Sequence, residues 1–287
     1  MTMEGIKIIE CPRDAMQGIE SFIPTQVKAK YINQLLKVGF DTIDFGSFVS
    51  PAAVPQMKDT AEVLSMLNLS QSKSKLLAII ANVRGAEQAL TFDEITYLGF
   101  PLSLSETFQK RNTNKSIEEA FAVVAEVQDL CVKKGKQFVV YLSMAFGNPY
   151  GDPFDIQYIS DFVKKLDSFQ IPVISLSDTI GVSTEENITF LFKNLCPAFP
   201  KIEFGAHLHS NPFTSYSKIK SAYLAGCRRF DTALNGFGGC PMAKDELVGN
   251  VATETLIKFL KDSEISPGIN QEELELSMAL VSQVFPK

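Results

Sequence analysis

The stretch Ser116–Phe146, SIEEAFAVVAEVQDLCVKKGKQFVVYLSMAF, carries the pattern that decides the fold. In its first part, SIEEAFAVVAEVQDLCVKK, apolar residues recur at helical spacing, Ser116 is a good N-cap with Glu119 three residues later, and Gly135 ends the helix. The second part, Gln137–Phe146, is a nearly continuous apolar run, which is typical of a parallel strand buried on both faces. A helix that leads into a buried strand indicates an α/β fold with parallel strands.

The same alternation of strand and helix repeats along the chain. The strand-like runs are Lys7–Cys11, Thr42–Phe48, Lys75–Asn82, Ile95–Ser103, Gln137–Phe146, Pro172–Asp178, Ile202–Ser210 and Arg229–Gly236. Helical patterns cover Gln26–Val38, Asp59–Leu67, Gly85–Leu90, Ser116–Lys134, Asp155–Phe169, Thr184–Leu195 and Phe213–Ala225, and two further stretches, Gly249–Lys261 and Gln271–Val284, look like closing helices. Eight such units favour a closed (β/α)8 TIM barrel with extra C-terminal helices, and the alternative is a doubly wound open sheet.

The length and composition agree with one large domain. Barrels of this class commonly reach 287 residues as one unit, and a hydrophobic content of 45% provides a large core. No internal repeat or linker divides the chain. We therefore expect a single catalytic domain over residues 1–287, with the barrel at about 5–262 and a C-terminal helical segment at about 263–287.

The charge pattern excludes several classes of partner and location. With 27 basic and 33 acidic residues the net charge is −6, which gives no general attraction for nucleic acid or an anionic membrane. The N-terminus, MTMEGIKIIE, lacks the features of a signal peptide, and no apolar run is long enough to span a bilayer, so a soluble cytoplasmic protein is expected. Five cysteines without a C-x-x-C pair argue against a disulfide scaffold or a structural zinc site.

The only two histidines, His207 and His209, lie two residues apart in the run IEFGAHLHS. Side chains two apart on a strand point to the same face, so both imidazoles can converge on one ion. This register predicts a metal site. The alternative is a surface strand with two solvated histidines, because H-x-H is a short motif.

Polar residues occur at the ends of all eight predicted strands, where barrels of this class place their chemistry. In chain order they are Arg13, Asp14, Asp44, Asn82, Ser105, Glu106, Ser143, Asp178, His207, His209 and Cys240. A carboxylate inside an apolar strand, such as Asp44, is costly to bury without a partner, and Arg13 is the expected one. Asn82, Ser105, Ser143 and Asp178 fit equally well as caps of the following helices.

The loop Gly236–Ala243, GFGGCPMA, surrounds Cys240 with three glycines. A cysteine on such a loop at the active face of a barrel can act in proton transfer, unlike a packed thiol. The same glycine pattern also fits a turn or a segment that contacts phosphate.

Several segments together resemble the 3-hydroxy-3-methylglutaryl-CoA lyase family, and they follow the family's order from Pro12 to about Leu256. They are PRDAMQ (Pro12–Gln17), FVSPAAVPQM (Phe48–Met57), SETF (Ser105–Phe108), SLSDTIG (Ser175–Gly181), HLH, GFGGCPMA and Gly249-Asn250. The P-R-D, H-x-H and D-T-x-G elements are shared with the wider superfamily of metal-dependent aldolases and Claisen-condensing enzymes. The cysteine loop and the V-S-P and P-Q-M segment are typical of the lyase.

The resemblance implies a role for each matching residue. Asp14, His207 and His209 would bind a divalent cation, Mg²⁺ or Mn²⁺, with Asn250 as a further ligand or neighbour. Arg13 and Cys240 would be catalytic, supported by Asp178 and Asp44. Asp44 stands where the family commonly has glutamate, and one extra residue separates Cys240 from Asn250, which makes Asn250 the least secure ligand.

The resemblance also implies the reaction, which is cleavage of 3-hydroxy-3-methylglutaryl-CoA to acetyl-CoA and acetoacetate, as in leucine degradation. Arg13 would stabilise the thioester enolate and Cys240 would protonate it, whereas Asp178, His207 or a metal-bound group could take the hydroxyl proton. Lys110 and Arg111 are candidates for the CoA phosphates, although both also fit a solvated helix end. The family implies a homodimer.

Two other functions remain open at this stage. A condensing enzyme or aldolase of the same superfamily would use the same metal residues on a 2-keto acid. A barrel that binds metal for recognition alone is disfavoured because Arg13, Asp14, Asp178 and Cys240 exceed what metal binding requires.

Overall fold

Eight parallel strands close into a barrel in the computed structural model, which describes residues 5–239 and 248–285. The barrel strands are β1 (Lys7–Glu10), β2 (Thr42–Ser47), β3 (Lys75–Ile79), β4 (Ile95–Ser103), β5 (Gln137–Ser143), β6 (Val173–Ser177), β7 (Glu203–His207) and β9 (Arg229–Thr232). Strand β1 pairs with β2 on one side and with β9 on the other, and this closes the sheet. The predicted TIM barrel is confirmed, and the open sheet is wrong.

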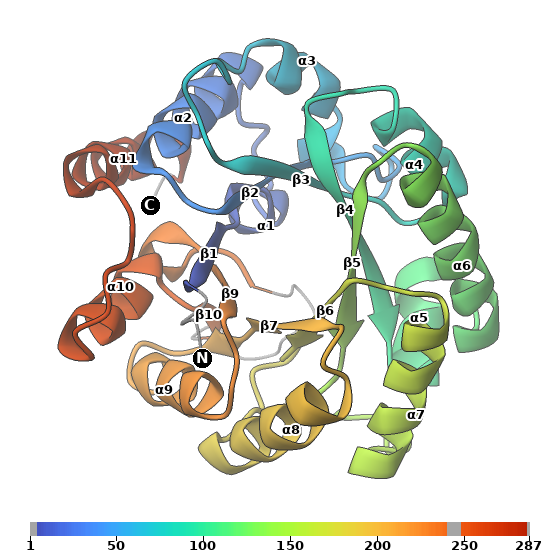
Figure 1. The fold of residues 1–287 in the computed structure, drawn as a ribbon. Coiled ribbons are helices and arrows are strands. Elements are labelled where there is room, and N and C mark those ends of the chain that lie inside the picture. The colour runs from blue at the N-terminus through green and yellow to red at the C-terminus, as the bar shows by residue number, and fades with distance from the viewer. Residues whose placement is uncertain (1–4, 240–247, 286–287) are drawn as a thin grey trace.

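The helices surround the barrel on its outside, except for the first one, which lies within the ring of strands beside β1 and β2 in the view of Figure 1 down the barrel axis. They are α1 (Pro12–Gln17), α2 (Thr25–Val38), α3 (Thr60–Ser65), α4 (Val83–Ala89), α5 (Glu106–Thr113), α6 (Ile117–Lys133), α7 (Ile156–Ser168), α8 (Glu185–Ala198), α9 (Ser215–Leu224), α10 (Thr253–Asp262) and α11 (Gln271–Val284), with two 3₁₀ turns, η1 (Pro55–Met57) and η2 (Leu234–Gly236). The expected capping box is present, because Ser116 accepts from the backbone N–H of Glu119 while the Glu119 side chain accepts from that of Ser116.

The strands are buried on both faces, as their apolar runs predict. All six residues of β2 are buried, and the outer faces of the strands join the helices in one extended core. A smaller cluster that includes Tyr97, Val139 and Tyr141 forms a separate packed unit. Gly99 makes room for it, because a Cβ there would lie 2.6 Å from Ile79 Cδ1 and 2.9 Å from Tyr141 Cε2.

Two details at the mouth of the barrel differ from the prediction. The run Ile202–Ser210 is not one strand: β7 ends at His207, and His209–Ser210 form a separate strand, β8, that pairs antiparallel with β10 (Gly249–Asn250). The predicted helix Gly249–Lys261 is therefore wrong in its first residues, and α10 begins only at Thr253. Local periodicity could not reveal this pairing, since its two strands are two residues long and about 40 residues apart in the chain.

Helices α1 and α5 were not predicted. Both are short, with six and eight residues, and α5 is mostly polar, so neither has a clear apolar stripe. Their place matters because α1 directly follows β1 and carries Arg13 and Asp14.

The last helix, α11, packs on α2, and the two lie side by side in Figure 1. Gln34 of α2 donates to the Glu273 carboxylate at 2.6 Å, and the Tyr31 ring meets the edge of Phe285 at 6.0 Å between centroids. This agrees with the expected C-terminal helix on the outside of the barrel. Among the described residues, no helix combines the length and the apolar character needed to cross a membrane.

Candidate metal centre

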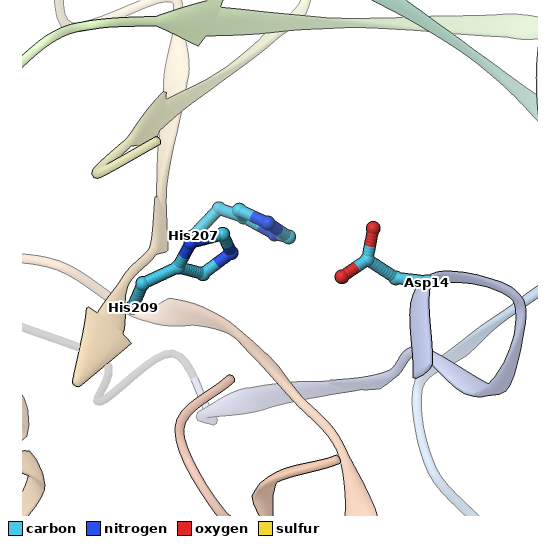
Figure 2. Close-up of side chains that lie close together, drawn as sticks. All are labelled: Asp14, His207 and His209. Carbon is cyan, nitrogen blue, oxygen red and sulfur yellow. The ribbon is translucent and has the colours of Figure 1, made fainter. Parts of the chain in front are cut away.

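Three side chains from opposite ends of the sequence meet at the mouth of the barrel. One possible ligand atom from each of Asp14, His207 and His209 lies within 4.8 Å of the others. Figure 2 shows the Asp14 carboxylate facing the two imidazole rings across a gap. Ligand atoms about 2.1 to 2.2 Å from one ion are at most about 4.4 Å apart, so a small inward movement would let all three share an ion.

His207 is held by a second carboxylate. Its Nδ1 lies 3.1 Å from Oδ2 of Asp231, and because a carboxylate can only accept, Nδ1 carries the proton. Burial lowers the pKa of His207, but the hydrogen bond to Asp231 and its negative charge outweigh this, so the pKa is raised overall. The bond leaves Nε2 as the nitrogen available to an ion, an arrangement common behind metal-binding histidines.

His209 is buried, with 3% of its surface exposed, so the H-x-H motif is not a solvated surface strand. Its ring packs beside that of His207, with 5.3 Å between centroids, and neither of its nitrogens has a hydrogen-bond partner among the described residues. Burial and the neighbouring charge of His207 lower the pKa of His209 to about 4. A neutral imidazole with buried, unpartnered nitrogens fits the donor that a divalent cation requires.

Asp14 is the anionic member of the group. Burial alone would raise its pKa, but the Arg13 guanidinium and the two histidines favour the charged form and hold the pKa of Asp14 at about 2. Arg13 Nη1 donates to Oδ1 at 2.9 Å, and Asn250 Nδ2 donates to Oδ2 at 2.8 Å. Asn250 thus lies directly beside the group, on the short strand β10 that pairs with the strand of His209.

Arg13 is fixed from two sides. Its Nε donates to both oxygens of Asp44 at 3.2 and 3.0 Å, and Nη2 donates to Asp44 Oδ2 at 2.5 Å, so Arg13 is the partner expected from the sequence. Its Nη1 donates to Asp14 and to Gln17. Burial raises the pKa of Asp44 to about 6, and the positive charge of Arg13 opposes that rise. The side chain of Asp44 is therefore long enough to reach the guanidinium, and the contact that the sequence comparison put in doubt is present.

Asp178 is held by donors from two elements. Its carboxylate accepts from the backbone N–H of Ser183 at 3.1 Å, from the Ser183 hydroxyl at 2.5 Å and from Lys218 Nζ at 3.2 Å. It therefore fixes the loop after β6. The capping alternative is wrong for Asp178, because the N-cap of the following helix, α8, is Thr184.

The glycine loop approaches the same centre. A Cβ on Gly238 would lie 2.8 Å from Asn250 Nδ2 and 3.0 Å from the carbonyl oxygen of Asp14, so only glycine lets the backbone come this close. The left-handed φ of +89° at Gly238 also favours glycine. Cys240, predicted to be catalytic, lies outside the described residues.

The remaining polar candidates have structural partners. Asn82 caps α4 by accepting from Gly85 N–H, and Ser105 caps α5 by accepting from Phe108 N–H, so the capping alternative holds for both. Glu106 pairs with Lys110 at 2.9 Å on the surface of α5. The capping alternative is wrong for Ser143, which is buried at the end of β5, because the next helix, α7, is capped by Asp155. The Arg111 guanidinium lies 4.9 Å from the centre of the Tyr150 ring.

Two charged groups of the centre, Asp231 and Lys218, were missed in the sequence. Asp231 lies inside β9, and the argument applied to Asp44, that a carboxylate in a buried strand needs a partner, could have found it. Lys218 lies on α9, where a lysine ordinarily faces solvent, so the sequence carried no signal for it.

Comparison with known proteins identifies the family. The chain is 33% identical over 270 residues to the rat enzyme named 3-hydroxy-3-methylglutaryl-CoA lyase, cytoplasmic, an alignment that covers 93% of this chain and 77% of the relative. The crystal structure of the Bacillus subtilis HMG-CoA lyase superposes with a TM-score of 0.91 at 30% identity, covering 97% of this chain and 93% of that one. An HMG-CoA lyase from Acinetobacter baumannii, in complex with coenzyme A and 3-methylmalate, superposes with a TM-score of 0.88 at 28% identity over 98% of this chain and 91% of that one. The model of the family described as HMGL-like matches residues 6–281, and the chain belongs to that family.

Proposed function

We propose that this chain cleaves 3-hydroxy-3-methylglutaryl-CoA to acetyl-CoA and acetoacetate with the help of a divalent cation. The observation that carries the proposal is the convergence of Asp14, His207 and His209 beside the Arg13–Asp44 pair, in a chain of the HMGL-like family. A solved relative that holds coenzyme A and a small hydroxy dicarboxylic acid supports the substrate class.

The side chains present suit a hard divalent cation. Two imidazoles, which bind a metal in their neutral form, and one carboxylate, with the Asn250 amide next to them, make a mixed nitrogen and oxygen donor set that fits Mg²⁺ or Mn²⁺ better than a closed zinc site. When bound, the cation supplies a Lewis acid that lowers the pKa of the 3-hydroxyl and orients the substrate. Asp14 and the two histidines would hold it.

Arg13 would stabilise the charge that develops on the thioester oxygen. When the C–C bond breaks, its electrons enter the thioester and form an enolate, so a fixed positive charge at that oxygen lowers the barrier. The double contact with Asp44 and the bond to Asp14 fix the guanidinium before substrate binds. Because no reorganisation is then needed during the reaction, Arg13 acts as a preorganised donor.

The two proton transfers need different groups. We assign the protonation of the acetyl-CoA carbanion to Cys240, since an ordinary thiol is mostly protonated at neutral pH and the described part of its loop, up to Gly239, packs on the centre. Asp178 is a weaker candidate for the group that takes the hydroxyl proton, because its oxygens already accept from Ser183 and Lys218. We therefore assign Asp178 to positioning.

Further expectations concern the CoA tail, assembly and location. Arg111, which packs on Tyr150, and Lys110 are proposed contacts for the CoA phosphates, since α5 follows the end of β4 at the catalytic mouth of the barrel. A homodimer is proposed from the family resemblance. A cytoplasmic location stays a separate proposal, and the relatives include proteins named cytoplasmic and proteins named mitochondrial.

One assay tests the function. Acetoacetate release from 3-hydroxy-3-methylglutaryl-CoA is measured in the presence of Mg²⁺, after chelation of the metal, and after Mg²⁺ is added back. We expect the activity to be lost on chelation and regained when the metal is restored. Condensation of acetyl-CoA with a 2-keto acid, without lyase activity, would favour the aldolase-like alternative. Full metal affinity with no turnover of any acyl-CoA would indicate a binding protein.

A further inference from the structure

Lys218 brings a positive charge into the wall of the metal centre from the helical layer. It lies on α9 with only 5% of its surface exposed. Its Nζ donates to the carbonyl oxygen of His209 at 2.8 Å, to Asp178 Oδ2 at 3.2 Å and to the carbonyl oxygen of Gly181 at 3.5 Å. An ammonium group has three donors, and all three are used here on two different segments.

The two segments are the loop after β6 and the short strand β8. Asp178 and Gly181 belong to the loop, and His209 begins the strand. Strand β8 is two residues long, lies outside the barrel sheet and, among the residues that the structure describes, pairs only with the equally short β10. Its backbone therefore lacks the support of a barrel ladder at the position where His209 must be held.

We propose that Lys218 is a positioning residue that fixes the backbone of His209 against the loop after β6 and so sets the geometry of the metal centre. The inference rests on the proposed metal site but goes beyond it, since Lys218 lies behind the ligands and does not belong to the set. Its contact with the His209 carbonyl supports the ligand through the main chain, and its charge compensates the buried Asp178.

The cost of removing Lys218 would be more than the loss of one contact. Asp178 has 1% of its surface exposed, so without the ammonium it would remain as a buried charge held only by Ser183. The loop and β8 would then either move apart or rearrange so that water can reach the Asp178 carboxylate. Outer-shell partners of this kind typically change metal affinity about 10- to 100-fold when replaced.

The chain offers a matched control in Lys28. This lysine on α2 is also buried, with 2% exposed, and it donates to a carboxylate, Asp59 at 2.7 Å, and to a backbone carbonyl, that of Gln56. Both acceptors lie in the segment around η1, which contributes none of the three grouped ligands. A Lys28→Met variant therefore suffers a similar chemical loss in a segment that supplies no grouped ligand, although this segment contacts α1.

The experiment measures Mn²⁺ affinity of the full chain by isothermal titration and by the electron paramagnetic resonance signal of free Mn²⁺. We expect Lys218→Met to bind Mn²⁺ at least about tenfold more weakly than the wild type, and Lys28→Met to bind within about twofold of it. Thermal unfolding should show a lowered midpoint for both variants. Should Lys218→Met fail to fold, Lys218→Gln, which retains a donor but loses the charge, carries the same comparison.

Each outcome decides the matter. Equal Mn²⁺ affinity in the wild type and the Lys218 variant would overturn the inference while leaving the metal site intact. An equal loss in the Lys28 variant would also overturn it, because general destabilisation would then explain the effect. A wild type that binds no Mn²⁺ would refute the proposed metal site itself and, with it, this role of Lys218.

Discussion

Replacing Asp231 by asparagine should weaken metal binding without removing any ligand. In the wild type the Nδ1–H of His207 donates to the buried carboxylate at 3.1 Å, which fixes the ring and leaves Nε2 for the ion. Asparagine has nearly the same size and shape and keeps one acceptor oxygen for the Nδ1–H of His207, but it removes the negative charge and replaces the second oxygen by an NH2 donor. The substitution therefore tests mainly the charge behind His207, with little change in the size of the side chain.

The expected loss follows from the two kinds of hydrogen bond. A bond to a charged group contributes about 1.5–3 kcal/mol and a neutral one about 1 kcal/mol, so the change costs about 0.5–2 kcal/mol. Since 1.4 kcal/mol corresponds to a factor of ten, the Mn²⁺ dissociation constant should rise about 2- to 30-fold. The upper part of this range overlaps the effects known for outer-shell carboxylates behind metal-binding histidines.

Isothermal titration with Mn²⁺ at pH 7.5 gives the measurement, and Asp262→Asn is the control. Asp262 is the last residue of α10, accepts from Lys258 and Tyr216 on the surface, and its replacement changes the net charge by the same amount. We expect the control to bind as the wild type does. Wild-type affinity in Asp231→Asn would refute the reasoning, because the charge behind His207 would then have no influence on the ion.

Three other substitutions separate metal binding, proton transfer and folding. His209→Ala removes a grouped ligand, and its Mn²⁺ affinity should fall by about 100-fold or more in the same titration. Cys240→Ala should keep wild-type Mn²⁺ affinity and melting temperature but lose about 10²-fold or more of acetoacetate release, and unimpaired turnover would remove Cys240 from the mechanism. Burial raises the pKa of Glu10 to about 8 from an ordinary value of 4.5. Between these values the unfolded chain has released the proton that the folded chain keeps, so wild-type stability falls as the pH rises through this window, by up to about 1.4 kcal/mol per unit. Glu10→Gln should therefore gain in thermal midpoint over the wild type at pH 8 compared with pH 5, and a pH-independent difference would contradict this.

The fold could be predicted from the sequence because its signals are local. The apolar composition of a run such as Gln137–Phe146 predicts that it is buried, and the cap at Ser116 predicts where the helix before it begins. Each of these elements can therefore be predicted from its own residues. Closure of the barrel followed from the count of units. The short helix α1 and the pair β8 and β10 could not be found in this way, since their stability comes from contacts with distant segments and not from their own periodicity.

The residues of the metal centre also differ in whether the sequence could predict them. Residues at strand ends could be proposed from their position, and the structure brings Asp14, His207 and His209 together with Arg13 and Asp44. Lys218 could not be proposed, because it reaches Asp178 across 40 residues from a helix whose pattern places it no differently from a surface lysine. A charge of this kind becomes visible only when the helix is packed on the barrel.

Asp231 is the more instructive case, because the sequence contained half of the information needed to find it. Its strand, β9, lies beside β7 in the closed barrel, with Gly205 opposite Arg229 and Ala206 opposite Phe230. Continuing this register places Asp231 next to His207 on the same face, where a carboxylate can accept from the imidazole. A shift of one residue would have turned Asp231 toward the helices, and strand boundaries read from periodicity are not accurate to one residue. The type and strand of the partner could thus be expected, while its contact with the histidine depends on a register that only the three-dimensional structure provides.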